Sequence, residues 1–150
     1  MKVLSKIRDK TSLVIVGCNF IGRALSVALE KKGFNVTLVD KSLEAFEKLS
    51  PEYKGNALLG DATTENTLAK FSFQDLEAIF ILTSSDNTNI FIAQMIRQKL
   101  KGNQRIIACL NDANRSDTYN IFDLETVSVE TMFAEAVSSH VDSLINGEHI

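Results

Sequence analysis

The residues best suited to chemistry in this chain form a glycine-bearing turn near its beginning, with the sequence G-C-N-F-I-G at residues 17–22. An uninterrupted apolar run precedes the turn, and apolar residues at helical spacing follow it. A strand, turn and helix in this order point free backbone N–H groups and the positive end of the helix dipole outward, where a phosphate is stabilised. The turn therefore predicts a nucleotide-binding site.

One position of this turn departs from the dinucleotide pattern G-x-G-x-x-G, because Asn19 stands at the middle glycine. Asparagine tolerates positive φ better than other non-glycine residues, so we expect the turn to persist. The substitution also adds a side chain at the point where a pyrophosphate would approach.

Asp40 ends the second apolar strand and lies 18 positions after Gly22. An acid about 20 residues beyond such a turn accepts hydrogen bonds from the ribose hydroxyls of adenosine. A carboxylate there would repel a 2′-phosphate, which favours NAD(H) or an adenine mononucleotide over NADP(H), although Lys41 could neutralise such a phosphate. The alternative interpretation is an acid that only ends a strand or caps the next helix.

Strands and helices alternate along the whole chain. Strands are expected at residues 12–16, 34–40, 56–59, 76–82, 105–110 and 125–128, and helices at 21–32, 42–49, 64–70, 87–100, 116–122 and 130–145. This alternation predicts an α/β fold with a doubly wound, parallel six-stranded sheet of the Rossmann kind, in the order 3-2-1-4-5-6. Ligands of that fold bind at the carboxyl ends of the strands around the switch point. Gly17, Asp40, Asp61 and Thr83 follow the first four strands, so we expect them to converge on one crevice.

Composition limits the classes of partner. The chain has 150 residues, a net charge of −3 and a pI of about 5.4, which gives no electrostatic reason to expect a nucleic acid. Residues 1–11 form a basic leader without the apolar region of a signal peptide, and no apolar run approaches the roughly 18 residues that span a bilayer. We expect residues 12–150 to form a single nucleotide-binding domain.

The cysteines and histidines show no metal-binding spacing. Cys18 and Cys109 lie in or beside predicted strands. We expect them to be small core residues of a protein in a reducing compartment. His140 and His149 are far from both, so no metal site is expected.

A dehydrogenase is the alternative function, because the same fold serves hydride transfer. Catalysis would require an acid–base group beside the cofactor. Tyr119 is followed four positions later by Asp123 rather than by lysine, and both histidines lie near the C-terminus. We therefore expect a non-catalytic protein, with an NAD-dependent oxidoreductase or another nucleotide-binding Rossmann protein as the alternative.

Motifs in the middle of the chain are more specific than the turn. They are G-D-A-T at residues 60–63, the strand at 76–82 that ends in Thr83, Asn89 and Ala93 on the next helix, and L-N-D at 110–112 after the fifth strand. Together they resemble the N-terminal nucleotide-binding domain of the regulators of K+ conductance, also called the RCK N-terminal or TrkA-N/KTN domain. The resemblance covers about residues 12–140, and the second, C-terminal lobe of many such proteins is not expected here. The chain is then either a one-lobe member or a fragment.

The resemblance implies a role for each matching position. Gly17 and Gly22 would form the phosphate turn, Asp40 would hold the ribose, and Asp61 with Ala62 would flank the adenine. The residues implied to contact the nucleotide are Gly17, Cys18, Asn19, Phe20, Ile21, Gly22, Asp40, Lys41, Asp61, Ala62, Thr83 and Ser84. Phe20 occupies a place that is often basic, and further contacts could come from Arg23, Arg105 or Arg115.

The resemblance also implies a function. The protein would be a cytoplasmic sensor of NAD(H) or of an adenine nucleotide (AMP, ADP or ATP) that controls K+ uptake or efflux through a membrane channel or transporter, at the inner face of the membrane. Such domains pair, so a homodimer or higher homo-oligomer is expected. The apolar stripe of the last helix, with Met132, Phe133, Val137 and Val141, would either serve this pairing or pack on the chain's own sheet.

Overall fold

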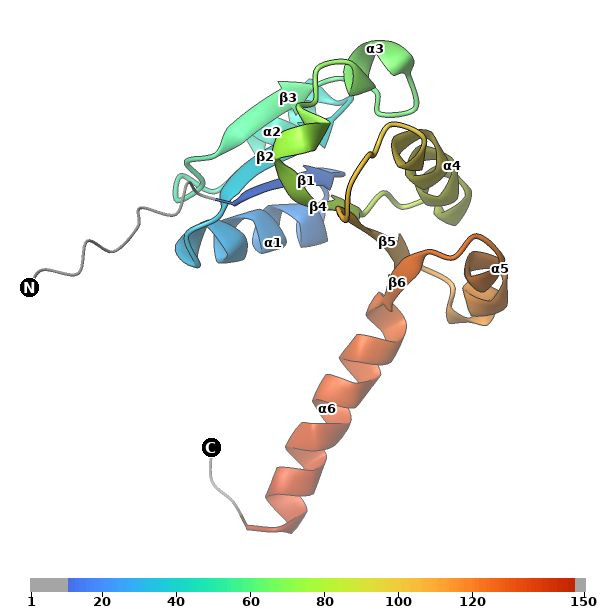
Figure 1. Ribbon diagram of the computed structural model, residues 1–150. Helices are drawn as coiled ribbons and strands as arrows, with labels where there is room; N and C mark the ends of the chain where they lie inside the picture. Colours follow the sequence, from blue (N-terminus) through green and yellow to red (C-terminus); the bar gives the residue numbers. More distant parts are fainter. Residues whose placement is uncertain (1–10, 148–150) are drawn as a thin grey trace, which may run out of the picture.

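The computed structural model describes residues 11–147 and shows one parallel sheet with helices on both faces (Figure 1). The sheet order is β3-β2-β1-β4-β5-β6, as predicted from the alternation of elements. The strands are β1 (Ser12–Val16), β2 (Asn35–Asp40), β3 (Asn56–Leu59), β4 (Leu76–Ile81), β5 (Arg105–Leu110) and β6 (Glu125–Ser128). The predicted basic leader lies outside the described residues, apart from Thr11.

The helices follow the predicted positions to within a few residues. They are α1 (Phe20–Lys31), α2 (Leu43–Glu47), α3 (Glu65–Leu68), α4 (Asp86–Arg97), α5 (Ser116–Ile121) and α6 (Val129–Ile145), with single 3-10 turns at η1 (Phe73–Asp75) and η2 (Ala113–Arg115). Side-chain caps define most of their starts: Asn19, Ser42, Thr64, Ser85 and Ser128 each accept a hydrogen bond from a backbone N–H of the first turn.

The central strand β1 contributes to two apolar clusters, one on each face of the sheet. Val14 and Val16 belong to the cluster that includes Ile92 and Ile96 of α4, whereas Ile15 belongs to the cluster against which α1 and α2 pack. This division follows from the alternation of side chains along a strand. A strand covered on both faces has no polar side, which explains the uninterrupted apolar run in the sequence.

Helix α6 packs on the sheet only at its start, where Val129 contacts the second apolar cluster. It projects away from the domain beyond β6 (Figure 1), and it contains no buried residue. Phe133 is 70% exposed and Val137 is 48% exposed. The alternative in which this stripe covers the chain's own sheet is therefore wrong. No helix within residues 11–147 has both the length and the apolar character needed to cross a membrane.

Candidate functional site

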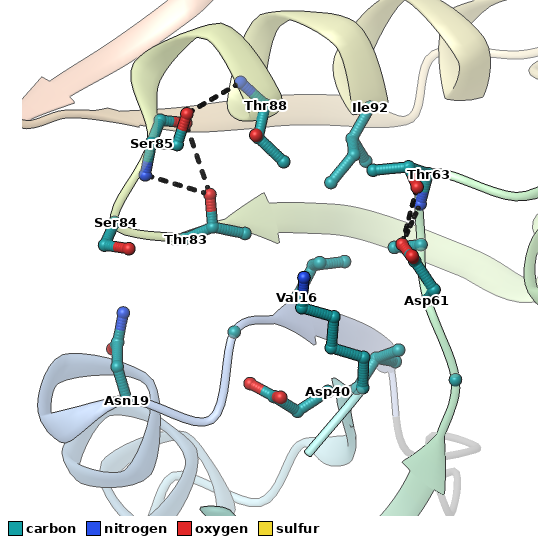
Figure 2. Close-up of a pocket in the computed structure, with 15 residues that line it drawn as sticks. Val16, Asn19, Asp40, Asp61, Thr63, Thr83, Ser84, Ser85, Thr88 and Ile92 are labelled. Atoms are coloured by element: carbon teal, nitrogen blue, oxygen red, sulfur yellow. Dashed lines mark hydrogen bonds between the residues drawn. The ribbon is translucent and has the colours of Figure 1, made fainter.

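A crevice of about 340 Å³ opens at the carboxyl edge of the sheet, where β1 and β4 adjoin (Figure 2). The predicted convergence of Gly17, Asp40, Asp61 and Thr83 is confirmed, because all four line this crevice. The full lining comprises Val16, Gly17, Asn19, Val39, Asp40, Lys41, Gly60, Asp61, Ala62, Thr63, Thr83, Ser84, Ser85, Thr88 and Ile92. Such an opening forms where the connections that follow two neighbouring strands turn toward opposite faces of the sheet. It is the usual ligand position in this fold.

The two outer glycines of the turn are required by close backbone contacts. Gly17 has φ of +113°, and a Cβ there would lie 2.9 Å from the carbonyl oxygen of Leu82. A Cβ on Gly22 would lie 1.9 Å from the carbonyl oxygen of Gly17. These contacts hold α1 tightly against the end of β1, as the glycine pattern predicts.

Asn19 has a different role from the one that its backbone tolerance suggests. Its φ is −80°, so this position does not use the positive φ that we expected asparagine to accommodate. Its side chain caps α1 instead: Oδ1 accepts a hydrogen bond from the Gly22 N–H at 2.9 Å. Its Nδ2 donates to the carbonyl oxygen of Leu82 at 2.5 Å, which ties the turn to the end of β4.

Asp40 is held by two backbone amides. One carboxylate oxygen accepts from the Cys18 N–H at 2.8 Å, and the other accepts from the Ser42 N–H, also at 2.8 Å. The carboxylate nevertheless faces the crevice, where its remaining lone pairs can accept hydrogen bonds from hydroxyl groups. This acid therefore organises the end of β2 and also lines the site, and its contact with a ribose stays a prediction.

Asp61 is fixed on the opposite side of the crevice. Its Oδ1 accepts from the Thr63 backbone N–H at 2.9 Å and from the Thr63 hydroxyl at 2.6 Å (Figure 2). The Thr63 hydroxyl and backbone bonds hold the pKa of Asp61 below its ordinary value, so the side chain is a carboxylate near neutral pH. The residue before it, Gly60, has no room for a side chain, because a Cβ there would lie 2.7 Å from the hydroxyl oxygen of Thr67.

The loop between β4 and α4 forms the upper wall in Figure 2. The fully buried Asn89 shapes it: its Oδ1 accepts from the Thr83 N–H at 3.1 Å, and its Nδ2 donates to the carbonyl oxygen of Cys109 at 3.0 Å. Ser85 caps α4 through the Thr88 N–H. These bonds place the Thr83 and Ser85 hydroxyls at the crevice.

Behind this loop, the buried Asp86 joins the start of α4 to the residues that follow β5. Its carboxylate accepts from the Asn111 N–H and side-chain Nδ2, both at 2.8 Å, and from the Asp112 N–H at 3.1 Å. Burial alone would raise the pKa of Asp86, but the hydrogen bonds from Asn111 and Asp112 outweigh it and the pKa is lowered. Asp86 is therefore a charged structural link in this part of the molecule.

Four predicted contact residues lie outside the lining. Cys18 is buried, and its thiol donates a hydrogen bond to the carbonyl oxygen of Ala45. Burial raises the pKa of this thiol, and the Asp40 carboxylate raises it further. Gly22 is buried inside α1, and Ile21 packs against the second apolar cluster. Phe20 is 79% exposed at the first position of α1. These four residues build the turn and its helix rather than the crevice wall.

The three arginines proposed as further contacts also lie outside the crevice lining. Arg23 donates to the carbonyl oxygen of Cys18 at 2.8 Å, within the turn. Arg105 begins β5, and the start of a parallel strand lies at the edge opposite the carboxyl ends; there it forms an ion pair with Glu125. Arg115 donates to the Asn87 side chain. For this topological reason Arg105 does not supply the further crevice contact that was considered for it.

Several lining residues were absent from the predicted set: Val16, Val39, Gly60, Thr63, Ser85, Thr88 and Ile92. The signal for two of them is helical spacing, because Thr88 and Ile92 are four positions apart and share one face of α4. Val16 and Val39 are the last apolar residues before the ends of β1 and β2, where a strand's side chain already borders the opening.

Comparison with known proteins now adds to this geometry. The TrkA-N domain profile matches residues 13–130. The chain belongs to the TrkA-N domain family. The Trk system potassium uptake protein TrkA of Streptomyces coelicolor is 29% identical over 116 residues, which cover 77% of this chain and 52% of that protein. The chain thus spans about half the length of this curated relative.

Solved structures agree with the fold of this TrkA-N domain. The NAD(P)-binding domain of an exopolyphosphatase-related protein from Archaeoglobus fulgidus superimposes with a TM-score of 0.77 at 21% identity, over 89% of this chain and 99% of that one. The GsuK RCK domain has a TM-score of 0.72 at 26% identity, over 93% of this chain and 30% of that one. Direct contact of a nucleotide with the predicted residues of this chain stays a prediction.

Proposed function

We propose that this TrkA-N domain is a non-catalytic, nucleotide-sensing regulatory domain of a membrane K+ channel or transporter. The observation that carries the proposal is the convergence of Gly17, Asp40, Asp61 and Thr83 on one crevice at the switch point of the sheet. Membership of the TrkA-N family and the potassium uptake relative support the link to K+ transport.

The ligand proposed for the crevice is NAD(H) or an adenine nucleotide. Proteins of similar fold are described with such ligands: the GsuK channel bound to NAD, GsuK bound to ADP, and the Shewanella denitrificans Kef CTD in its AMP-bound form. In this chain, Asp40 would accept bonds from the ribose hydroxyls, Asp61 and Ala62 would flank the base, and Thr83 would lie at the far wall.

A sensing role is supported by the positions of the candidate acid–base groups. The Tyr119 hydroxyl donates to the backbone carbonyl of Asp86 at 2.9 Å, and burial raises the pKa of Tyr119. His140 lies on α6 and bonds to the carbonyl oxygen of Ala136 in its own helix. Neither side chain lines the crevice, so neither is placed to exchange a proton with a ligand there.

We further propose that the domain forms a homodimer through α6. A groove of about 470 Å³ lies between α1 and the start of α6, on the sheet face that α6 leaves open. It is lined by Ile21, Leu25, Phe80, Leu82, Ile107, Cys109, Glu125, Val127, Val129, Met132 and Phe133. A contiguous apolar surface that is exposed to solvent is typical of an interaction site.

The occupant proposed for this groove is α6 of a second copy. Met132 and Phe133 belong both to the groove and to the exposed stripe that continues through Val137 and Val141, so the two surfaces are continuous. A twofold axis near the start of α6 would place each stripe on the partner's groove and bury both at once. The paired domains would then act in the cytoplasm, at the inner face of the membrane, through the channel or transporter.

Two measurements test the proposed function. The melting temperature of the full chain is recorded with NAD, NADH, AMP, ADP or ATP at millimolar concentration; a ligand at a hundredfold excess over its Kd stabilises the fold by about 2.7 kcal/mol. An unmoved melting temperature with all five would contradict nucleotide sensing. Incubation with NADH and a panel of ketones and aldehydes is expected to give no turnover at enzymatic rates.

The transport role is tested in the cells that carry this chain. Deleting it is expected to change the uptake or efflux of 86Rb+, a K+ tracer, and the unaltered chain is expected to restore the flux. A matched pair of variants, Asp40→Arg in the crevice and Asp117→Arg on exposed α5, separates nucleotide sensing from general damage to the protein. Fluxes that do not respond to the deletion would refute the link to K+ transport.

A further inference from the structure

The side chain of Asn19 lies where a dinucleotide would pass from one half of the site to the other. In a sheet of order 3-2-1-4-5-6, a dinucleotide extends across the switch point between β1 and β4. Asn19 spans this point, since its Oδ1 binds the Gly22 N–H of α1 and its Nδ2 binds the Leu82 carbonyl oxygen beyond β4. Figure 2 shows Asn19 reaching from the start of α1 toward the loop that carries Thr83 and Ser84.

These two hydrogen bonds form a bridge from α1 to Leu82, and the bridge uses backbone groups that a pyrophosphate would approach. The Gly22 N–H belongs to the first turn of α1, where orphan donors otherwise face a bound phosphate, and it is already paired with Asn19. The contact to Leu82 draws the turn toward β4, beside the 2.8 Å backbone bond from the Leu82 N–H to the Val16 carbonyl. A pyrophosphate at this position would have to displace the asparagine side chain.

At the carboxyl edge of the sheet beyond β4, polar groups of the protein form hydrogen bonds with one another. Asn111, just after β5, donates from Nδ2 to the Thr83 carbonyl at 3.1 Å and to Asp86 at 2.8 Å. Asp86 accepts two further bonds from the backbone of Asn111 and Asp112. A second nucleoside that used this part of the edge would compete with these bonds, and a partly buried polar group that loses its partner is destabilised.

The lining of the crevice ends at β4 and α4. Its lining comes from the ends of β1, β2, β3 and β4 and from the start of α4, and it includes no residue of β5 or β6. The ribose-binding candidate Asp40 ends β2, and the base-flanking candidates Asp61 and Ala62 follow β3, so all three lie on the β1–β3 side of the switch point.

From these observations we propose that the site selects an adenine mononucleotide over a dinucleotide, and that Asn19 is the residue that sets this selectivity. The inference rests on the proposed nucleotide-sensing function and names the ligand class within it. It assigns a purpose to the one position at which the turn departs from the glycine pattern. Asparagine there closes the passage that a glycine would leave open.

Isothermal titration of the full chain with AMP and with NADH tests the proposal. The unaltered chain is expected to bind AMP at least tenfold more tightly than NADH. Asn19→Gly removes the bridge, and Asn19→Ser retains a hydroxyl that can cap α1 but is too short to reach Leu82. Both variants are expected to shift the ratio of the two affinities toward NADH by at least tenfold.

A control and three outcomes complete the test. Ser128→Gly removes the cap of α6, far along the chain from the crevice lining, and is expected to leave the ratio unchanged. Equal affinities for AMP and NADH in the unaltered chain, or an unchanged ratio in both Asn19 variants, would overturn the selectivity proposal while nucleotide sensing stands. Failure of AMP, ADP, ATP, NAD and NADH to bind would overturn both proposals.

Discussion

The backbone N–H of Cys18 donates a hydrogen bond of 2.8 Å to the Asp40 carboxylate, which joins the glycine turn to the end of β2. The residue predicted to hold a ribose therefore also holds the turn that precedes α1. Ligand binding and the local structure of the turn are coupled through one side chain, since any movement of Asp40 toward a ribose acts on the Cys18 amide.

Asp40→Ala is expected to lower the free energy of unfolding by about 1–3 kcal/mol, because it leaves the partly buried Cys18 N–H without its acceptor. Urea denaturation of the chain without added nucleotide measures this loss. Asp117→Ala, which removes an exposed carboxylate on α5, serves as the control and is expected to change stability by less than about 1 kcal/mol. Equal stability of the Asp40 variant and the unaltered chain would show that the turn does not depend on this acid.

Asp40→Arg is expected to weaken binding of adenine nucleotides that carry free ribose hydroxyls and to relax the rejection of a 2′-phosphate. The reason is charge, since a carboxylate repels the phosphate and a guanidinium attracts it. Titration with the pairs NADH and NADPH, and 5′-AMP and 2′,5′-ADP, measures the change in preference. Lys41→Ala in the same assays shows how far the neighbouring lysine contributes. An unchanged preference in the Asp40 variant would mean that this acid is structural only.

The Asp86 carboxylate is expected to make stability fall in acid. Its pKa in the folded chain lies below the value of about 3.9 expected in the unfolded chain, so the unfolded state takes up the proton first. The contribution of this group is complete above the unfolded pKa, and it is lost as the pH falls from about 5 through the folded pKa. Urea denaturation between pH 7 and pH 3 should show this decline.

Asp86→Asn isolates that contribution. Asparagine replaces one acceptor oxygen with a donor facing the Asn111 and Asp112 N–H groups, so the variant should be less stable than the unaltered chain at pH 7. The difference should narrow toward pH 3, because protonation of Asp86 in the unfolded state removes part of the stabilisation that the native carboxylate provides. Asp117→Asn, on exposed α5, is expected to keep the original pH dependence. A gap that stays constant with pH would contradict the role assigned to the charge.

Phe133→Asp combined with Val137→Asp is expected to convert the proposed homodimer to a monomer, because two carboxylates would be buried in an apolar groove. Sedimentation over a range of protein concentrations measures the change in mass. Glu135→Gln, on the same helix but outside that stripe and groove, is the matched control and should stay dimeric. A monomer at all concentrations for the unaltered chain would contradict pairing through α6.

Most of the fold was predictable from local pattern, because strand and helix periods depend on residues close in the sequence. The switch from continuous apolar runs to helical spacing located all six strands, and the right-handed crossover of parallel strands then limited their order. The four strand-end residues were predictable for the same reason, since parallel strands end at one edge. Arg105 begins β5, so the same rule places it at the edge of the sheet opposite the crevice.

The contacts of single side chains were not predictable in the same way. Asn19 was expected to matter through its backbone, whereas it acts through a side-chain bond to Leu82, 63 positions away. Thr88 and Ile92 enter the crevice because α4 packs beside β5 and begins at the crevice's upper wall. Partners so distant in sequence meet only when the sheet has assembled.

The sequence by itself determined the parallel sheet, its strand order, the glycine turn and the apolar stripe of α6, because each follows from the spacing of residue types along the chain. Only the tertiary structure decided that α6 leaves the sheet, that Asp40 anchors the turn, and that Asn19 bridges α1 and β4. The physical reason is that spacing shows which face of an element is apolar or which turn a backbone favours. It does not show which distant group a face or a side chain will meet.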